Sequence, residues 1–184
     1  MILSNSEKLI LIMLADIQEK LGIKEDVDTE LLKNAISKNQ LWALSWGMPG
    51  IVDSSPNDSP PELDEVQKIL DMWRFIEEAH ATFDDLGKAR IATEADPFGT
   101  DVKFGGFDAN EESDHYGIAT FLIEDLGRFK HFNEHELNSH FPLIEVYRRM
   151  LAVFSPIRKT LASGILTEDQ VIALLNAMHY QEGS

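Results

Sequence analysis

The 184-residue chain contains no cysteine. This absence excludes disulfide scaffolds, thiolate metal sites, thiol nucleophiles and dithiol redox chemistry. The chain is also poor in basic residues, with 16 Lys and Arg against 32 Asp and Glu, so its formal net charge is −16. Such a charge repels phosphate backbones and anionic lipids. We therefore expect neither nucleic acid nor membrane among its partners.

Long apolar runs are missing as well. The stretch near the N-terminus, residues 9–15, has seven apolar residues, whereas a membrane-spanning helix needs about 20. The first 20 residues also lack the basic start and small-residue cleavage site of a secretory signal, because Glu7 precedes Lys8 and charges resume at Asp16. These features predict a cytoplasmic protein.

Apolar residues are nevertheless abundant, and they recur at helical spacing. Hydrophobic residues make up 43% of the chain, enough for one folded core at this length. From Pro61 onward they recur every three or four positions, which predicts one long helix over about residues 62–92. The sequence predicts an all-α fold: a single domain over 1–184, a compact bundle of about six helices with this long helix at its centre, and at most a short strand pair.

The first helix is predicted over about residues 5–21. Ser4 and Glu7 have the spacing of a capping box, and Gly22 offers a left-handed stop. Residues 9–15 are apolar on every side of this helix, so they need cover all round, from other helices of the chain or from a second copy. Of these two, we favour a central core helix over a subunit interface.

Turn-forming residues interrupt the helical pattern after the second predicted helix, which Asp28 or Thr29 caps. Residues 47–61 are rich in Pro, Ser, Gly and Asp, so we predict an exposed surface loop there. Three later helices are predicted, over 108–127, from Pro142 onward, and after a capping box at 167–170.

Three histidines are candidate metal ligands: His131, His135 and His140. On a helix, His131 and His135 share one face at i and i+4, the spacing with which two imidazoles bind one zinc ion. His140 follows five positions later, about 140° further round, so the segment does not form the H-E-x-x-H motif of metalloproteases. The alternative, which we favour, is a polar connection whose histidines make local hydrogen bonds or face water.

No other reaction motif is present in the sequence. There is no G-x-S-x-G nucleophile elbow and no glycine-rich phosphate loop, so we expect no cofactor. Acidic side chains over 104–127 and basic ones over 128–159 form oppositely charged segments. We favour pairing of these segments, within one subunit or between two, over an exposed anion site.

Several segments resemble the bacterial YfbU family. Residues 104–112 (FGGFDANEE), 127–132 (GRFKHF) and 147–151 (YRRML) are similar to family motifs in order and spacing. Residues 4–11 resemble the family's opening segment and 166–177 its close, so the resemblance covers most of the chain. It implies a helical, bacterial, cytoplasmic protein, and it implies no reaction, substrate, cofactor or catalytic residue.

Two hypotheses about function follow. The first is a noncatalytic interaction or regulatory protein that acts as a homo-oligomer through helix 5–21 or helix 62–92. The second is a metal-assisted, hydrolase-like enzyme that uses the region of His131 and His135. We favour the first hypothesis, because the sequence contains no group of reactive residues that must come together in space to form a catalytic site. A ligand sensor with a pocket between helices is a third possibility that depends on packing.

Overall fold

The computed structural model describes residues 2–23, 27–53, 59–161 and 164–179. These residues form eight α-helices, and no strand occurs among them. The predicted all-α class is confirmed, although the count is eight helices rather than about six. The helices are α1 (Asn5–Leu21), α2 (Thr29–Ser37), α3 (Leu44–Gly47), α4 (Leu63–Thr82), α5 (Asp85–Glu94), α6 (Ser113–Thr120), α7 (Ile144–Thr160) and α8 (Glu168–Asn176).

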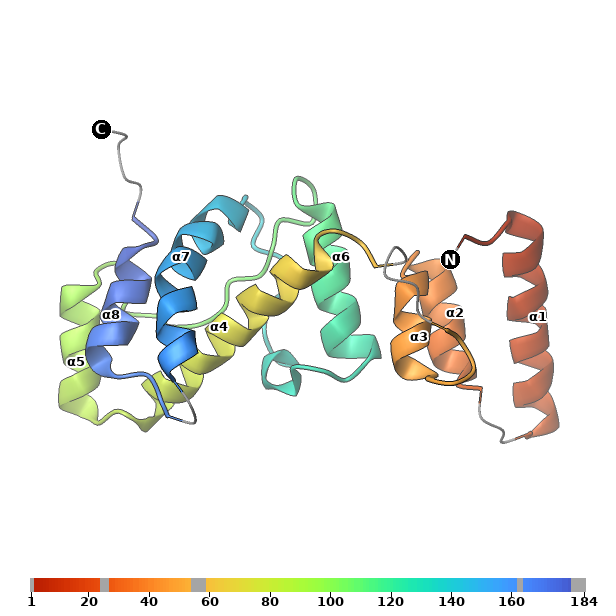
Figure 1. Cartoon of the computed structure of the whole chain (residues 1–184), viewed down its shortest axis with the longest axis horizontal. Helices are drawn as coiled ribbons and strands as arrows, with labels where there is room; N and C mark the ends of the chain where they lie inside the picture. The colour runs from red at the N-terminus through yellow and green to blue at the C-terminus, as the bar shows by residue number, and fades with distance from the viewer. Residues whose placement is uncertain (1, 24–26, 54–58, 162–163, 180–184) are drawn as a thin grey trace.

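The helices lie in a row along the long axis of the molecule (Figure 1). α1, α2 and α3 form one end, with α1 at the outer edge and packed on α2. α4 crosses the remainder, where it packs against α6, α7 and α8, and α5 lies beside α8 at the far end. The first and last helices are therefore at opposite ends of the molecule.

α4 is the central helix, and its apolar residues form the middle of the core. Val66, Ile69 and Ile76 are completely buried, and Trp73 is nearly so. Their steps of three, four and three residues place them on one face of the helix, as the sequence pattern predicts. At 20 residues and 1.5 Å per residue, α4 is about 30 Å long, which spans the helices packed against it.

The prediction of one helix over about residues 62–92 is wrong, because the chain breaks at Asp84. α4 ends at Thr82, and the extended Asp84 accepts a hydrogen bond from the Gly87 N–H at 2.8 Å, which caps α5. An Asp side chain that bonds to nearby backbone competes with a continuous helix. The apolar spacing continues across the break, so periodicity alone did not reveal it.

The helix predicted over 108–127 begins later than expected. Asp108 accepts hydrogen bonds from the N–H groups of Asn110 and Glu111, at 2.7 and 3.2 Å, which closes a turn rather than starting the helix. α6 starts only at Ser113, and a π turn over Phe121–Asp125 continues it. Because α6 starts at Ser113, Glu112 lies just before the helix, and its side chain can bind another part of the chain.

α1 is peripheral, and the prediction of a central core helix is wrong. The Ser4–Glu7 capping box forms, and Gly22 ends the helix in the left-handed conformation. Yet Ala15 is the helix's one buried residue, because α1 packs on α2 by one face and lies at the edge of the molecule (Figure 1). The apolar run indicates that the helix must be covered on several sides. It does not indicate which helices, or which copy of the chain, cover it.

Other predicted elements are found with small shifts. The capping box at Thr167 and Gln170 starts α8, and Asp28 caps α2. Residues 54–58 of the predicted surface loop lie outside the described residues, and Met48 near the loop's start is buried. None of the helices in the described ranges is long and apolar enough to cross a membrane.

A single backbone bridge replaces the predicted strand pair. The Phe107 N–H donates to the Leu137 carbonyl at 3.0 Å, and the Ser139 N–H donates to the Phe107 carbonyl at 3.1 Å. Gly106, just before the bridge, has φ +84, and a Cβ there would lie 2.2 Å from the Leu137 carbonyl oxygen. Close backbone approach therefore requires glycine at this position.

We predict that Gly106→Ala destabilises the protein by about 2–4 kcal/mol, because it adds a backbone clash to the strain of a positive φ. Gly22→Ala is the matched control. Gly22 also has a positive φ, +66, but nothing lies within 4 Å of its Cβ position, so only about 1 kcal/mol is expected. Urea unfolding of both variants measures the difference. Equal losses would show that the approach of Gly106 to Leu137 does not matter.

Candidate functional site

Glu77 on α4 holds two histidines from a distant segment. Its carboxylate lies 2.6 Å from His131 Nε2 and 3.0 Å from His135 Nε2, through the same oxygen. The other oxygen accepts the Phe104 N–H at 2.6 Å. The Glu77 side chain is 9% exposed, and such a buried carboxylate requires partners of this kind. The cluster fastens two loops to the central helix.

The histidine segment reaches Glu77 through a tight turn rather than an α-helix. Phe129 has φ 50, and a 3-10 turn over Lys130–Phe132 follows. Phe132 is completely buried and anchors the turn, with its ring 5.3 Å from that of Phe104. The His131 and His135 rings end up 5.9 Å apart. The two rings therefore lie together at Glu77, although the segment is not an α-helix.

His140 makes none of these contacts. It is exposed, with φ 59, and its backbone N–H donates to the Asn138 side chain. The donor atoms of Glu77, His131 and His135 are at hydrogen-bonding distances, whereas nitrogen and oxygen ligands around zinc stand about 3.3 Å apart. Among the residues that the structure describes, no three His, Asp or Glu side chains are arranged to hold a metal ion.

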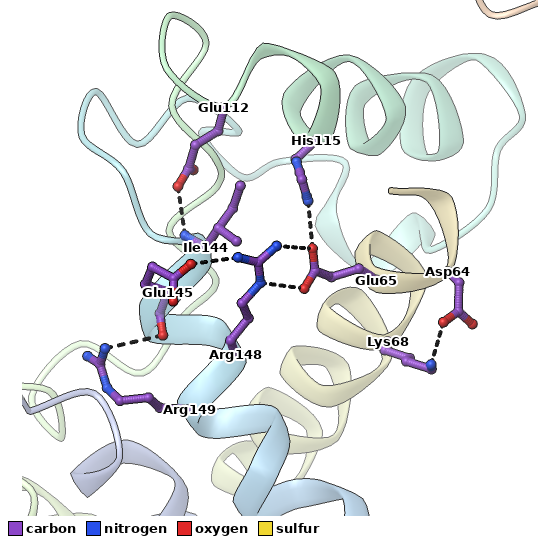
Figure 2. Close-up of polar contacts among 9 residues, drawn as sticks. All are labelled: Asp64, Glu65, Lys68, Glu112, His115, Ile144, Glu145, Arg148 and Arg149. Atoms are coloured by element: carbon purple, nitrogen blue, oxygen red, sulfur yellow. Dashed lines mark hydrogen bonds and ion pairs between the residues drawn. The ribbon is translucent and has the colours of Figure 1, made fainter. Parts of the chain in front are cut away.

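A second carboxylate of α4, Glu65, lies in a similar cluster (Figure 2). Arg148 of α7 binds it through two nitrogens, Nε at 2.7 Å and Nη2 at 3.0 Å, and His115 Nε2 of α6 lies 2.9 Å from it. The Arg148 guanidinium is the main reason that the pKa of Glu65 is lowered to about 2. Glu65 therefore ties three helices together, and it is too weak a base for proton transfer near neutral pH.

Glu112 caps α7 from another part of the chain (Figure 2). Its buried carboxylate accepts N–H groups from Leu143 and Ile144 at 2.6 and 2.7 Å, and from Asp108 at 3.0 Å. A negative charge at a helix N-terminus is stabilised by the helix dipole. Burial, and then the charge of Glu112, raises the pKa of Tyr147, whose hydroxyl donates to the Gly106 carbonyl. This tyrosine stays neutral and structural.

Among the described residues, the basic segment 128–159 makes its intrachain ion pairs mainly with α4 and none with 104–127; pairing between two subunits stays a prediction. Arg148 binds Glu65, and Arg158 binds Asp71 at 3.1 Å. Arg128 instead places its guanidinium 4.7 Å from the centre of the Trp46 ring. Opposite charge along the sequence did not identify these partners, because the two segments contact each other through backbone N–H groups, as at Glu112, rather than through ion pairs.

α1 carries a second, uncovered apolar face. We call Ile10, Leu14, Ile17 and Leu21 the α1 seam; these side chains are 56%, 56%, 50% and 68% exposed. Their spacing of four, three and four residues places them in one line along the helix. Leu9 and Met13, similarly exposed, flank that line. The other face, with Leu11, Ile12 and Ala15, packs inward.

Two charged residues of α1, Asp16 and Glu19, are turned away from the seam. Asp16 and Glu19 pair with Lys33 of α2, at 3.3 and 2.7 Å. Glu7 is held in the capping box at the first turn, and Lys20 lies in the last turn. An apolar line bordered by engaged charges is typical of a helix that pairs with another helix.

A groove of about 810 Å³ lies between the N-terminal segment and the start of α6. Residues from α1, η1 (Leu41–Ala43), the segment 59–62 just before α4, and α6 line it, and they include Lys8, Lys38, Glu62 and Asp114. Its volume is that of a small-molecule site. Its lining mixes both charges, however, and does not select one ligand chemistry.

Comparison with known proteins identifies the family. A family model described as YfbU domain matches residues 1–177. The chain belongs to the YfbU family. This YfbU chain is also similar to UPF0304 protein MJECS11 of Methanocaldococcus jannaschii, at 32% identity over 79 residues, which are 40% of this chain and 46% of that protein. The matched stretch spans less than half of that relative, and no solved structure matches the chain.

Family membership confirms the resemblance seen in the sequence. Family membership does not assign a reaction to this YfbU chain, so its function has to be inferred from its own residues. Sequence reasoning singled out His131 and His135 but missed Glu65, Glu77 and Glu112. No local signal marks these acids, because each finds most of its partners far along the chain.

We predict that Glu65→Gln destabilises the protein by about 1–2 kcal/mol at pH 7, a figure reduced for solvent screening because Arg148 is half-exposed. The pKa of Glu65 is lowered, so its contribution is complete above about pH 4.5 and is lost as pH falls towards about 2. The stability difference between wild type and variant should shrink over that window. Urea unfolding at pH 7, 4 and 3 measures it.

Asp64→Asn is the matched control for Glu65→Gln. Asp64 precedes Glu65 on α4 and pairs with Lys68, but its side chain is 76% exposed (Figure 2). An exposed pair of this kind contributes less than about 0.5 kcal/mol. A difference for Glu65→Gln that stays constant down to pH 3 would contradict the lowered pKa.

Proposed function

We propose that this YfbU protein is a noncatalytic interaction or regulatory protein that acts as a homo-oligomer in the cytoplasm, with the α1 seam as its contact surface. The exposed seam carries this proposal. The carboxylate clusters of α4 support it indirectly: Glu65 and Glu77 are occupied by structural partners, and neither cluster presents a free nucleophile beside a base.

Exposed apolar area argues for a partner at α1. Six aliphatic side chains on one helix, each at least half exposed, together present on the order of a few hundred Å² of apolar surface. Patches of that size on soluble proteins commonly mark interaction sites. Other exposed apolar residues, such as Leu86 and Phe141, lie on separate elements and need no such explanation.

The net charge of −16 sets the conditions for association. Two copies repel each other at long range, so the contact must be apolar and close. Salt screens this repulsion over about 8 Å at physiological ionic strength. Association should therefore be measured at 0.15 M salt or above, and anionic ligands are disfavoured as partners.

We predict that the wild-type chain is a dimer at tens of micromolar by light scattering, and that Leu14→Glu weakens association at least about 100-fold, because it places a charge in the middle of the seam. Leu86→Glu is the matched control. Leu86 is 81% exposed on α5, at the other end of the molecule, so this variant should remain dimeric. Circular dichroism should show that both variants stay folded.

A wild-type chain that remains monomeric at 100 μM in 0.15 M and 0.5 M salt would refute the proposal. So would a dimer that Leu14→Glu leaves intact. Equal loss of association in Leu14→Glu and Leu86→Glu would show that charge, rather than the seam, controls association.

The second candidate function, a metal-assisted hydrolase-like enzyme, is favoured by one observation: His131 and His135 meet at Glu77. An ion there would have to displace hydrogen bonds to the carboxylate. Calorimetric titration with Zn²⁺ tests it, with His131→Gln as the variant and the exposed His140→Gln as its control. Binding lost in His131→Gln alone would support this candidate, and a wild type that binds no Zn²⁺ would eliminate it.

A further inference from the structure

We propose that two copies of the chain pair through antiparallel α1 helices, in a register that sets Ile10 against the partner's Leu21 and Leu14 against the partner's Ile17. This inference rests on the proposed function and adds the partner's orientation and the facing residues. It is carried by the spacing of the seam, by the charges at the ends of α1 and by the position of α1 at the edge of the molecule.

The spacing of the seam fixes the register. Ile10, Leu14, Ile17 and Leu21 follow the four-three-four rhythm of a coiled-coil core. In the proposed antiparallel register each of the four faces another member of the seam, so every layer is apolar. A shift of seven residues towards the N-terminus would place Glu7 opposite the partner's Ile17. A charge would then enter the apolar layer.

The charges at the ends of α1 fix the orientation. Glu7 lies in the first turn, on the line that the seam follows, and Lys20 lies in the last turn. A parallel pair would face Glu7 with the partner's Glu7, and would also align the two helix dipoles. An antiparallel pair keeps the two Glu7 side chains apart and opposes the helix dipoles.

The outer face of α1 is accessible and presents enough apolar surface area to bind a second copy. α1 packs on α2, Leu11, Ile12 and Ala15 face the core, and the opposite face of the helix lies at the outer edge of the molecule (Figure 1). Two α1 helices, each about 25 Å long, would cover on the order of 700 Å² of apolar surface between them. With a polar rim this approaches the roughly 1,000 Å² of a specific interface, which favours a micromolar dimer.

Engineered cysteines test the register directly, because the chain has none of its own. Leu14→Cys and Ile17→Cys are prepared separately, one with an affinity tag, then mixed and oxidised with glutathione disulfide. We expect the mixed dimer, with Cys at 14 bonded to the partner's Cys at 17, to form at least about 10-fold faster than either self-paired dimer. Leu86→Cys is the control and should couple to neither.

The outcomes separate the register from the proposed function. Self-paired disulfides that form as fast as the mixed one indicate a parallel helix pair and overturn the inference. A dimer by light scattering without any disulfide at these positions overturns the inference as well, and the proposed function then stands only if Leu14→Glu still abolishes that dimer. A monomer in every variant and in wild type refutes both.

Discussion

Burial of the apolar face of α4 is the constraint on which most of the structure depends. Once Val66, Ile69, Trp73 and Ile76 are removed from water, the polar residues at the edges of that face are brought close to whatever covers it. Two of them, at positions 65 and 77, are carboxylates that then require partners. The covering segments supply an arginine and three histidines. Polar pairing therefore follows from apolar packing, and it fixes how α6, α7 and the histidine turn sit on the helix.

The sequence predicted structure correctly where the interactions join residues that are close together in the chain. The capping boxes at the starts of α1 and α8 need only residues three apart, and both form. The apolar period identified α4 but passed over the break at Asp84, because a capping side chain ends a helix without disturbing the spacing of apolar residues. The late start of α6 has the same origin, since Asp108 closes a turn of its own first.

The carboxylate clusters could not have been predicted from one sequence. Glu77 is 54 residues from His131, and Glu65 is 83 residues from Arg148. The histidine pattern predicted that His131 and His135 would lie together, and it also suggested His140, which is exposed elsewhere. What the pattern omitted was Glu77, whose negative charge explains why two imidazoles gather in this place. The chemistry of the cluster is decided by packing that brings α4 beneath the turn.

α1 packs on α2 rather than on α4, so packing against α4 does not determine its position. A monomer needs only one apolar face on a helix at its edge, and the other face is normally polar. In α1 the second face is instead aliphatic in an unbroken four-three-four line, while Asp16 and Glu19 are drawn aside to Lys33. Single exposed apolar residues are common, but four in register are not explained by the fold of one chain. The interior of a single copy accounts for α4 and its clusters, whereas the second aliphatic face of α1 is the surface that a second copy would cover in the proposed pairing.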